Sequence, residues 1–89
     1  MPTPPPLTKP TIHLNGSGRD RLSEALEEAR AALRKAIEAV QATAPNGRDY
    51  YPQGPDAIRV ATIEHGNRMN YLQIVDRELA ELHEHVVDS

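Results

Sequence analysis

Residues 22–40 read LSEALEEARAALRKAIEAV, and this stretch decides the fold. Its apolar residues recur at intervals of four, three, four, three and four positions, at Leu22, Leu26, Ala29, Leu33, Ala36 and Val40. This spacing is typical of a heptad stripe along one side of an α-helix, and the opposite side is charged. Further apolar residues widen the stripe towards the width used in helical bundles: Ala25, Ala32 and Ile37.

The helix is expected to extend beyond this stretch in both directions. Ser17 is a suitable N-cap, and Asp20 three residues later resembles a capping box and favours the positive end of the helix dipole. Pro45 disfavours helical geometry at the residue before it, and Asn46-Gly47 is a turn pair. We therefore expect the helix to end near Thr43.

A second helix is predicted from about Pro55 to about Val87, because proline is well tolerated at the first helical position. Every seventh residue falls on its inner stripe: Ile58, His65, Leu72, Leu79 and Val86. The positions between them on the stripe are Ala61 or Thr62, Met69, Val75 and Leu82. Three residues lie outside the stripe and indicate a second contact face: Ile63, Asn70 and Ile74.

These helices predict an all-α fold: an antiparallel two-helix hairpin over residues 11–89, preceded by an extended Pro-rich arm over residues 1–10. Wide apolar stripes stay half exposed in a lone hairpin. A chain of 89 residues without cysteine also has a marginal core and no disulfide to reinforce it. We therefore expect a homo-oligomer, most simply a two-fold dimer that forms a four-helix bundle.

The segment before the first helix has two parts. Prolines at positions 2, 4, 5, 6 and 10 predict a flexible, solvated arm, with recognition of a PxxP pattern by a partner domain as the alternative. Residues 11–14 alternate polar and apolar and then meet the turn pair Asn15-Gly16. We expect Ile12 and Leu14 to dock on the helices; the alternative is strand pairing with another subunit.

Composition narrows the functional classes. A net charge of −3 with interspersed signs argues against binding to a nucleic-acid polymer. No apolar run approaches the ~18–20 residues of a membrane span, and the N-terminus does not resemble a secretory signal. Without cysteine there is no Cys-based zinc site, and no Ser/His/Asp arrangement stands out. We predict no enzymatic activity, metal or cofactor.

The segment between the two helices, residues 44–55, carries the most recognition chemistry. It is longer than a helical hairpin requires and holds two of the three tyrosines. An arginine pairs well with phosphate or carboxylate, and a tyrosine stacks on planar groups. The candidate ligand-binding residues are Asn46, Arg48, Asp49, Tyr50, Tyr51 and Gln53, together with Arg68. In the alternative reading a tyrosine plugs the end of the bundle and Arg48–Asp49 is a local ion pair.

Histidines at two places in the second helix are candidates for a metal ligand or a general base. His65 lies on the inner stripe, where a hydrogen-bonded packing residue is commoner than a metal ligand or general base. Glu81 and His85 are one turn apart and close to His83, but two ligands do not make a metal site. A histidine near a helix C-terminus also has a favourable interaction with the dipole.

Two segments, TIHLNG at residues 11–16 and NGRDYYPQGPDA at residues 46–57, resemble small uncharacterised proteins encoded by tailed phages and prophages. The resemblance implies a phage accessory protein in the cytoplasm of the bacterial host. In that setting we expect a self-associating, non-enzymatic protein that binds a small polar ligand, such as a nucleotide immune signal sequestered to counter host defence. The alternative is a phage structural or assembly protein, or a module that binds a host protein.

Overall fold

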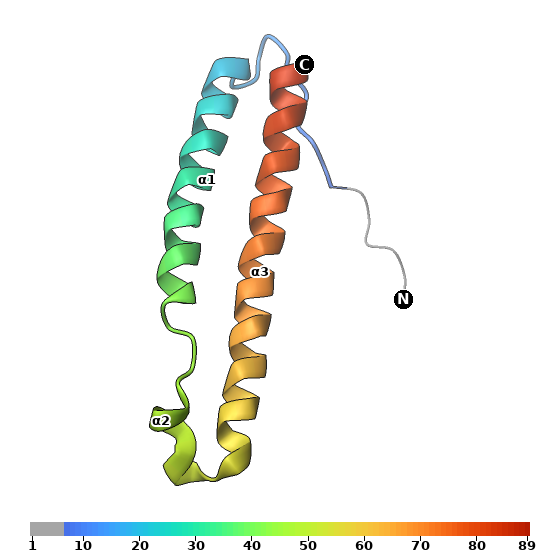
Figure 1. Ribbon diagram of the computed structural model, residues 1–89. Helices are drawn as coiled ribbons and strands as arrows, with labels where there is room; N and C mark the ends of the chain where they lie inside the picture. Colours follow the sequence, from blue (N-terminus) through green and yellow to red (C-terminus); the bar gives the residue numbers. More distant parts are fainter. Residues whose placement is uncertain (1–6) are drawn as a thin grey trace.

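The computed structural model describes residues 7–89, which form three α-helices and one short 3-10 helix (Figure 1). Two helices are long: α1 spans Arg19–Gln41 and α3 spans Pro55–Asp88. The short elements between them are α2, Gly47–Tyr50, and the 3-10 helix η1, Tyr51–Gln53. The described residues contain no strand, so the all-α prediction is confirmed for them. None of these helices combines the length and apolar character needed to cross a membrane.

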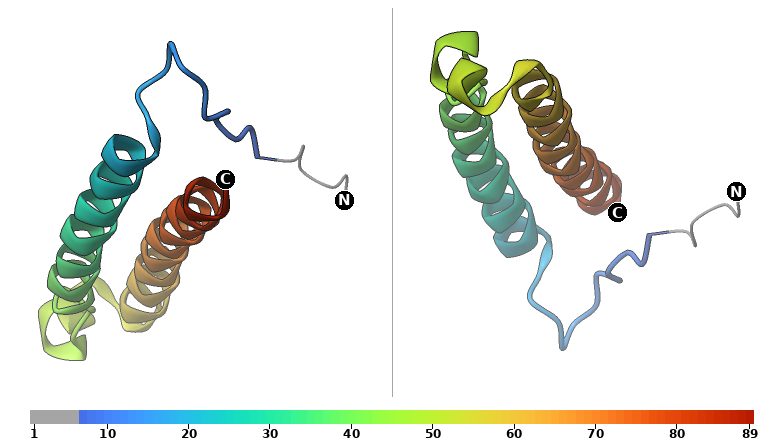
Figure 2. Two further views of the ribbon diagram at one scale, coloured as in Figure 1. Left: turned by 90° about the horizontal axis from the view of Figure 1, so that it is seen from above. Right: turned by 90° about the horizontal axis from the view of Figure 1, so that it is seen from below.

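Helices α1 and α3 lie side by side and run in opposite directions, as the views along and across them agree (Figures 1 and 2). Side chains far apart in the sequence meet across their seam: Ser23 contacts His83, and Arg30 contacts Asp76. The molecule is a rod with extents of 61 × 32 × 17 Å. Its shortest dimension is below two helix diameters of about 10–12 Å each, so the two long helices form a single layer.

The start of α1 differs from the prediction. The N-cap is Gly18, with φ of +85° and no side-chain cap, and the helix begins at Arg19 rather than after Ser17. A positive φ suits glycine, which has no Cβ to clash, so the chain turns sharply into the helix at this point. The end is close to the expected place: α1 stops at Gln41, and the Oγ1 of Thr43 donates to the carbonyl of Val40.

The inner stripe of α1 is shifted from the predicted one at two positions. Ala29 and Ala36 are exposed, and the residues after them, Arg30 and Ile37, face α3 instead. The observed stripe, Leu26, Arg30, Leu33, Ile37 and Val40, keeps intervals of four and three residues, which place side chains on one side of a helix. The other predicted inner residues of α1 are half-buried: Leu22, Leu26, Leu33 and Val40.

Helix α3 begins at the predicted Pro55 and ends at Asp88, one residue beyond the prediction. Its inner stripe is mostly as expected, with half-buried or buried side chains at Ile58, Ala61, His65, Met69, Leu72, Leu79, Leu82 and Val86. Thr62 is exposed, so Ala61 takes the inner position that the sequence left open. The prediction for Val75 was wrong, because it is 44% exposed and Asp76 faces α1 in its place.

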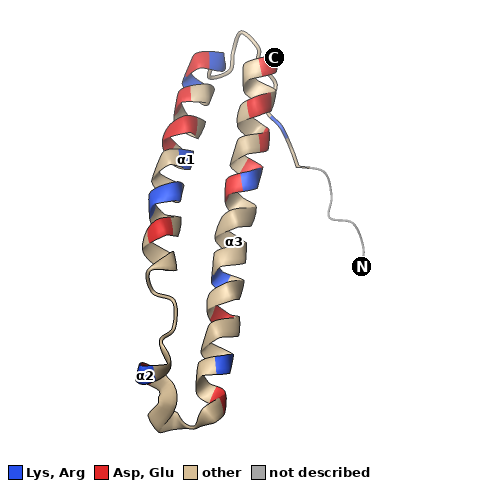
Figure 3. Cartoon of the chain, in the orientation of Figure 1, with Lys and Arg blue, Asp and Glu red and all other residues tan. Residues whose placement is uncertain are grey.

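The core of this layer is thin. Among the described residues only Ala61 and Val86 are buried, and every other inner side chain keeps part of its surface in solvent. Several large apolar side chains of α3 are exposed: Val60, Ile63, Tyr71, Ile74, Val75 and Val87. Charged residues of both signs mark α1 along its length, whereas residues 69–75 of α3 carry none (Figure 3).

The segment before α1 docks only in part. Ile12 is half-buried as expected, but Leu14 is fully exposed, as the second residue of the turn in which the Gly16 N–H donates to the His13 carbonyl. Residues 9 and 10, predicted to lie in a solvated arm, instead contact α3. The Nζ of Lys9 lies 3.1 Å from Oε1 of Glu81. The predicted arm's other four prolines, at positions 2, 4, 5 and 6, lie outside the described residues.

Candidate functional site

The predicted ligand-binding segment folds into a compact turn between α1 and α3. Asn46 caps α2, because its Oδ1 accepts a hydrogen bond of 2.9 Å from the backbone N–H of Arg48. Gly54 has φ of +108° and lets the chain reverse from η1 into α3. Its N–H donates to the carbonyl of Tyr51, which closes the turn.

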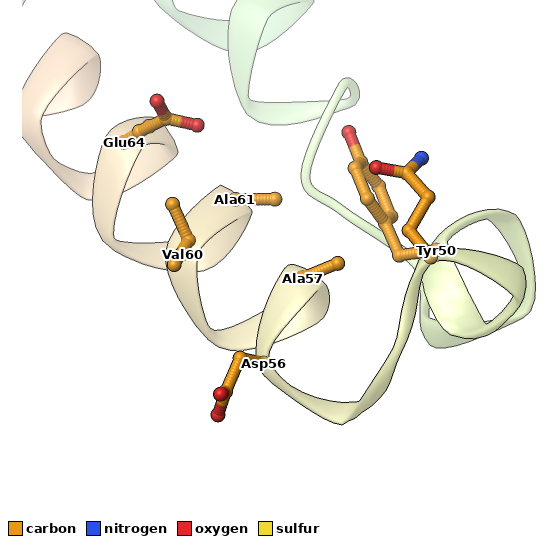
Figure 4. A pocket seen from close by; sticks show the side chains of 7 residues that line it. Tyr50, Asp56, Ala57, Val60, Ala61 and Glu64 are labelled. Carbon is orange, nitrogen blue, oxygen red and sulfur yellow. The ribbon is translucent and has the colours of Figure 1, made fainter.

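An open hollow lies where this turn meets the first turns of α3 (Figure 4). Tyr50 and Gln53 form the side contributed by the turn. The facing wall is one side of α3, namely Asp56, Ala57, Val60, Ala61 and Glu64. The volume of about 350 Å³ is at the lower end of the range for small-molecule sites.

The lining decides what kind of group the hollow favours. The half-buried Tyr50 ring faces the small side chains of Ala57 and Ala61, with Asp56 and Glu64 at the edges (Figure 4). An aromatic face and carboxylates attract a cation or a neutral planar group. No lysine or arginine lines the hollow, so a phosphate would find carboxylates and no countercharge there.

Two of the predicted site residues line the hollow, Tyr50 and Gln53. The side chain of Arg48 folds back towards its own helix cap, with its Nε 3.5 Å from Oδ1 of Asn46. Tyr51 is 75% exposed and lies outside the hollow. The other predicted residues, Asp49 and Arg68, are exposed and also lie outside it.

The sequence predicted two structural roles for the turn, a tyrosine that plugs the end of the bundle and a local ion pair between Arg48 and Asp49. Tyr50 is the tyrosine that packs against the end of the helix pair, and Tyr51 is not. The Arg48–Asp49 ion pair is not among the ion pairs that residues 7–89 form.

The sequence reasoning missed the wall of the hollow on α3. Asp56 and Glu64 are not among the predicted site residues, although Ala57, Val60, Ala61 and Glu64 have the spacing of one helix face. That spacing, starting beside a turn that contains an aromatic residue, was the available signal.

A second polar cluster bridges the seam near the other end of the rod. The Nε2 of His83 lies 3.0 Å from Oγ of Ser23 and 3.3 Å from Oε1 of Glu27. In a nucleophile–base–acid relay the acid contacts the ring nitrogen that the nucleophile does not. Here both groups share one nitrogen, so the cluster ties α1 to α3 and lacks the relay geometry.

His65 and His85 each lie against other parts of the protein. The Nδ1 of His65 is buried in the seam without a hydrogen-bond partner among the described residues, which differs from the expected hydrogen-bonded packing. The Nε2 of His85 donates to the carbonyl of Pro10 at 2.8 Å, while Glu81 pairs with Lys9. Residues 7–89 contain no group of three or more metal-ligating side chains of the His, Cys, Asp or Glu type.

Comparison of the chain with models of protein families, with characterised proteins and with solved structures finds no match.

Proposed function

We propose that this protein is a non-enzymatic helical module that acts by self-association, as a homo-oligomer in which two or more hairpins complete a shared bundle. The observation that carries this proposal is the thin core: only Ala61 and Val86 are buried among the described residues. Folded domains are stable by a small margin of about 5–15 kcal/mol, which depends on apolar burial.

A single layer of two helices cannot cover its own apolar side chains. Valine, isoleucine and tyrosine side chains of α3 remain in solvent. Packing a second layer on the first buries these surfaces without changing either helix, which is the arrangement of four-helix bundles. Without cysteine no disulfide can reinforce this core, and association is another means that small domains use.

The resemblance to phage-encoded proteins supports a biological setting for this proposal. We place the oligomer in the cytoplasm of an infected bacterium, as an accessory, assembly or host-binding module. The exposed ring of Tyr51 is a contact point suited to a protein partner, because aromatic side chains are enriched at interfaces.

Sedimentation equilibrium of the full chain across a hundredfold range of concentrations tests self-association. We expect a mass of at least two chains at micromolar concentration, and a melting temperature that rises with concentration, because association stabilises the folded state by mass action. Helicity by circular dichroism should fall on dilution together with the mass. A monomer that keeps its full helicity at the lowest concentration would refute the proposal.

A second candidate function is binding of a small ligand at the hollow beside Tyr50, which the lining residues favour. The carboxylates of Asp56 and Glu64 suit an organic cation or a neutral ring better than a nucleotide. A nucleotide signal would need Arg48 or Arg68 of another copy to approach the hollow.

Thermal shift of the full chain with three ligand sets separates these cases: cyclic nucleotides, adenine nucleotides and aromatic amines. Binding raises the melting temperature by an amount that grows with the ratio of the free ligand concentration to its dissociation constant. A shift with amines alone supports the hollow as a cation site, and a shift with nucleotides supports sequestration of an immune signal. No shift with any ligand at millimolar concentration would remove the ligand-binding candidate and leave self-association unaffected.

A further inference from the structure

The segment before α1 is tied to α3 by its polar contacts. Residues 7–12 run beside the C-terminal turns of α3 (Figures 1 and 2). The Nζ of Lys9 lies 3.1 Å from Oε1 of Glu81, and Nε2 of His85 donates to the carbonyl of Pro10 at 2.8 Å. Three side chains of this segment are half-buried: Leu7, Pro10 and Ile12. We call residues 7–12 the strap.

The strap is held weakly. Within residues 7–89 it makes no backbone–backbone hydrogen bond, and its polar contacts with the helices are those to Glu81 and His85. The side chains of Lys9 and Glu81 are 37% and 53% exposed, and ion pairs with this much solvent contribute little to stability. A hollow of about 350 Å³ also lies between Lys9 and α3, so solvent reaches this interface.

The link between the strap and α1, residues 13–18, has the character of a hinge. Residues 13–17 are all exposed, and the turn within them is closed by one hydrogen bond, from the Gly16 N–H to the His13 carbonyl. Gly18 has φ of +85°, a conformation that glycine adopts freely. Because these contacts are local, the strap can leave α3 without breaking a bond within either long helix.

The strap lies at the end of the seam that holds the most buried side chain, Val86, with an exposed fraction of 0%. Seven residues separate the contacts Ser23–His83 and Arg30–Asp76 on both helices, and this register places Val86 level with the first turn of α1. That turn offers three exposed charged side chains before the half-buried Leu22: Arg19, Asp20 and Arg21. Apolar cover for Val86 from outside α3 is therefore left to Leu22 and the half-buried residues of the strap.

We propose that the strap is a latch over the C-terminal end of the helix pair, which opens about residues 13–18 while α1 and α3 stay together. The closed latch shields Val86, and the open latch presents this apolar end and the ring of His85 to solvent. The two long helices keep their own contacts in both states, at Ser23–His83 and Arg30–Asp76. Segments with few buried contacts are the ones that open locally in folded proteins. The latch does not depend on self-association.

A single introduced thiol reports the opening, because the chain has no cysteine of its own. Val86→Cys places the thiol under the latch, and Ala61→Cys places one in the seam far from it, at a residue that is 6% exposed. A buried thiol reacts with a labelling reagent only when it is uncovered, so its rate of labelling follows the open fraction. Both variants are measured as full chains, at one protein concentration.

Reversing the charge of the strap should open the latch. The hollow beside Lys9 is lined by three carboxylates, those of Glu81, Glu84 and Asp88, so Lys9→Glu replaces attraction by repulsion. We expect the thiol at position 86 to react at least about threefold faster at low ionic strength, and the thiol at position 61 to keep its rate. Adding Glu81→Lys restores opposite signs and should slow the labelling again.

The other lysine of the chain provides the matched control. Lys35 is exposed on α1, so Lys35→Glu makes the same change of charge away from the strap and should alter neither rate. If Lys9→Glu speeds labelling at positions 86 and 61 equally, the strap opens only with the whole fold and the latch is refuted. An unchanged rate at position 86 would refute it too, because the strap would then not cover Val86. Ile12→Cys, with the thiol on the strap itself, carries the same test if Val86→Cys lowers the helicity.

Discussion

Arg30 of α1 and Asp76 of α3 form an ion pair across the middle of the seam, with 3.3 Å between Nε and Oδ1. Both side chains are largely shielded, with exposed fractions of 24% and 25%. Each occupies an inner position of its helix, where an apolar side chain would otherwise pack. An unpaired charge at such a place is unfavourable, so the pair favours the one register of α1 against α3 that brings the two charges together.

Replacing one residue of this ion pair should lower the stability of the fold more than replacing both. Asp76→Ala leaves the guanidinium of Arg30 half-buried and unpaired, and we expect it to lower the free energy of unfolding by about 1–3 kcal/mol. The double variant Arg30→Leu with Asp76→Leu should be as stable as the unchanged chain or more so, because apolar packing replaces a desolvated pair. Urea unfolding at one fixed protein concentration measures both. If both variants lost the same free energy of unfolding, the cost of leaving one buried charge unpaired would not be the main effect of the pair.

Two adjacent valines near the end of α3 offer a test of the packing. Val86 has an exposed fraction of 0% and Val87 of 51%. We expect Val86→Ala to lower the free energy of unfolding by about 1–3 kcal/mol, because it removes buried methyl groups and leaves a small void. Val87→Ala should change it by less than about 0.5 kcal/mol. Similar effects at both sites would show that this end of the helix pair is packed differently.

Glycines in two backbone conformations should respond oppositely to alanine. Gly54 has φ of +108°, so Gly54→Ala strains the turn and should destabilise the fold by about 1–2 kcal/mol. Gly66 lies inside α3 with open space where a Cβ would sit, so Gly66→Ala should stabilise by about 0.5–1 kcal/mol. Thermal unfolding followed by circular dichroism measures both. A destabilising Gly66→Ala would indicate a neighbour that needs the open space, such as another copy of the chain.

Much of the fold is predictable from the sequence, because the apolar residues of both long helices recur at helical spacing over many turns. The bounds of α3 follow from Pro55 and from the repeat of apolar residues to Val86. The inner stripe is less predictable in detail. Counting apolar residues favours Ala29 and Val75 over their neighbours Arg30 and Asp76, whereas in the structure the two charged residues occupy the inner positions and pair with each other.

The candidate site is predictable only where its chemistry lies in the turn. Tyr50 and Gln53 stand out in a segment rich in polar and aromatic residues, and both line the hollow. Asp56 and Glu64 belong to α3 and look like ordinary solvated positions of a helix. Their role depends on the direction in which the turn folds back, which is set by the cap at Asn46 and by the conformation of Gly54. Neither can be read from periodicity.

The neighbouring tyrosines of the turn separate its structural role from a role in binding. Tyr50 is half-buried against the first turns of α3, so Tyr50→Ala should lower the free energy of unfolding by about 1–2 kcal/mol and abolish any ligand-induced thermal shift. Tyr51→Ala, with the same loss of an aromatic ring from an exposed site, should leave stability and ligand response unchanged.

A third variant keeps this comparison decisive. Tyr50→Phe preserves the packing against Ala57 and Ala61 and removes only the hydroxyl, so we expect the stability of the unchanged chain within about 0.5 kcal/mol. If the aromatic face is what the hollow offers a ligand, the thermal shift with aromatic amines persists in Tyr50→Phe. If the shift instead disappears in Tyr51→Ala and persists in Tyr50→Ala, the ligand binds at the exposed ring, and the hollow serves only to close the helix pair.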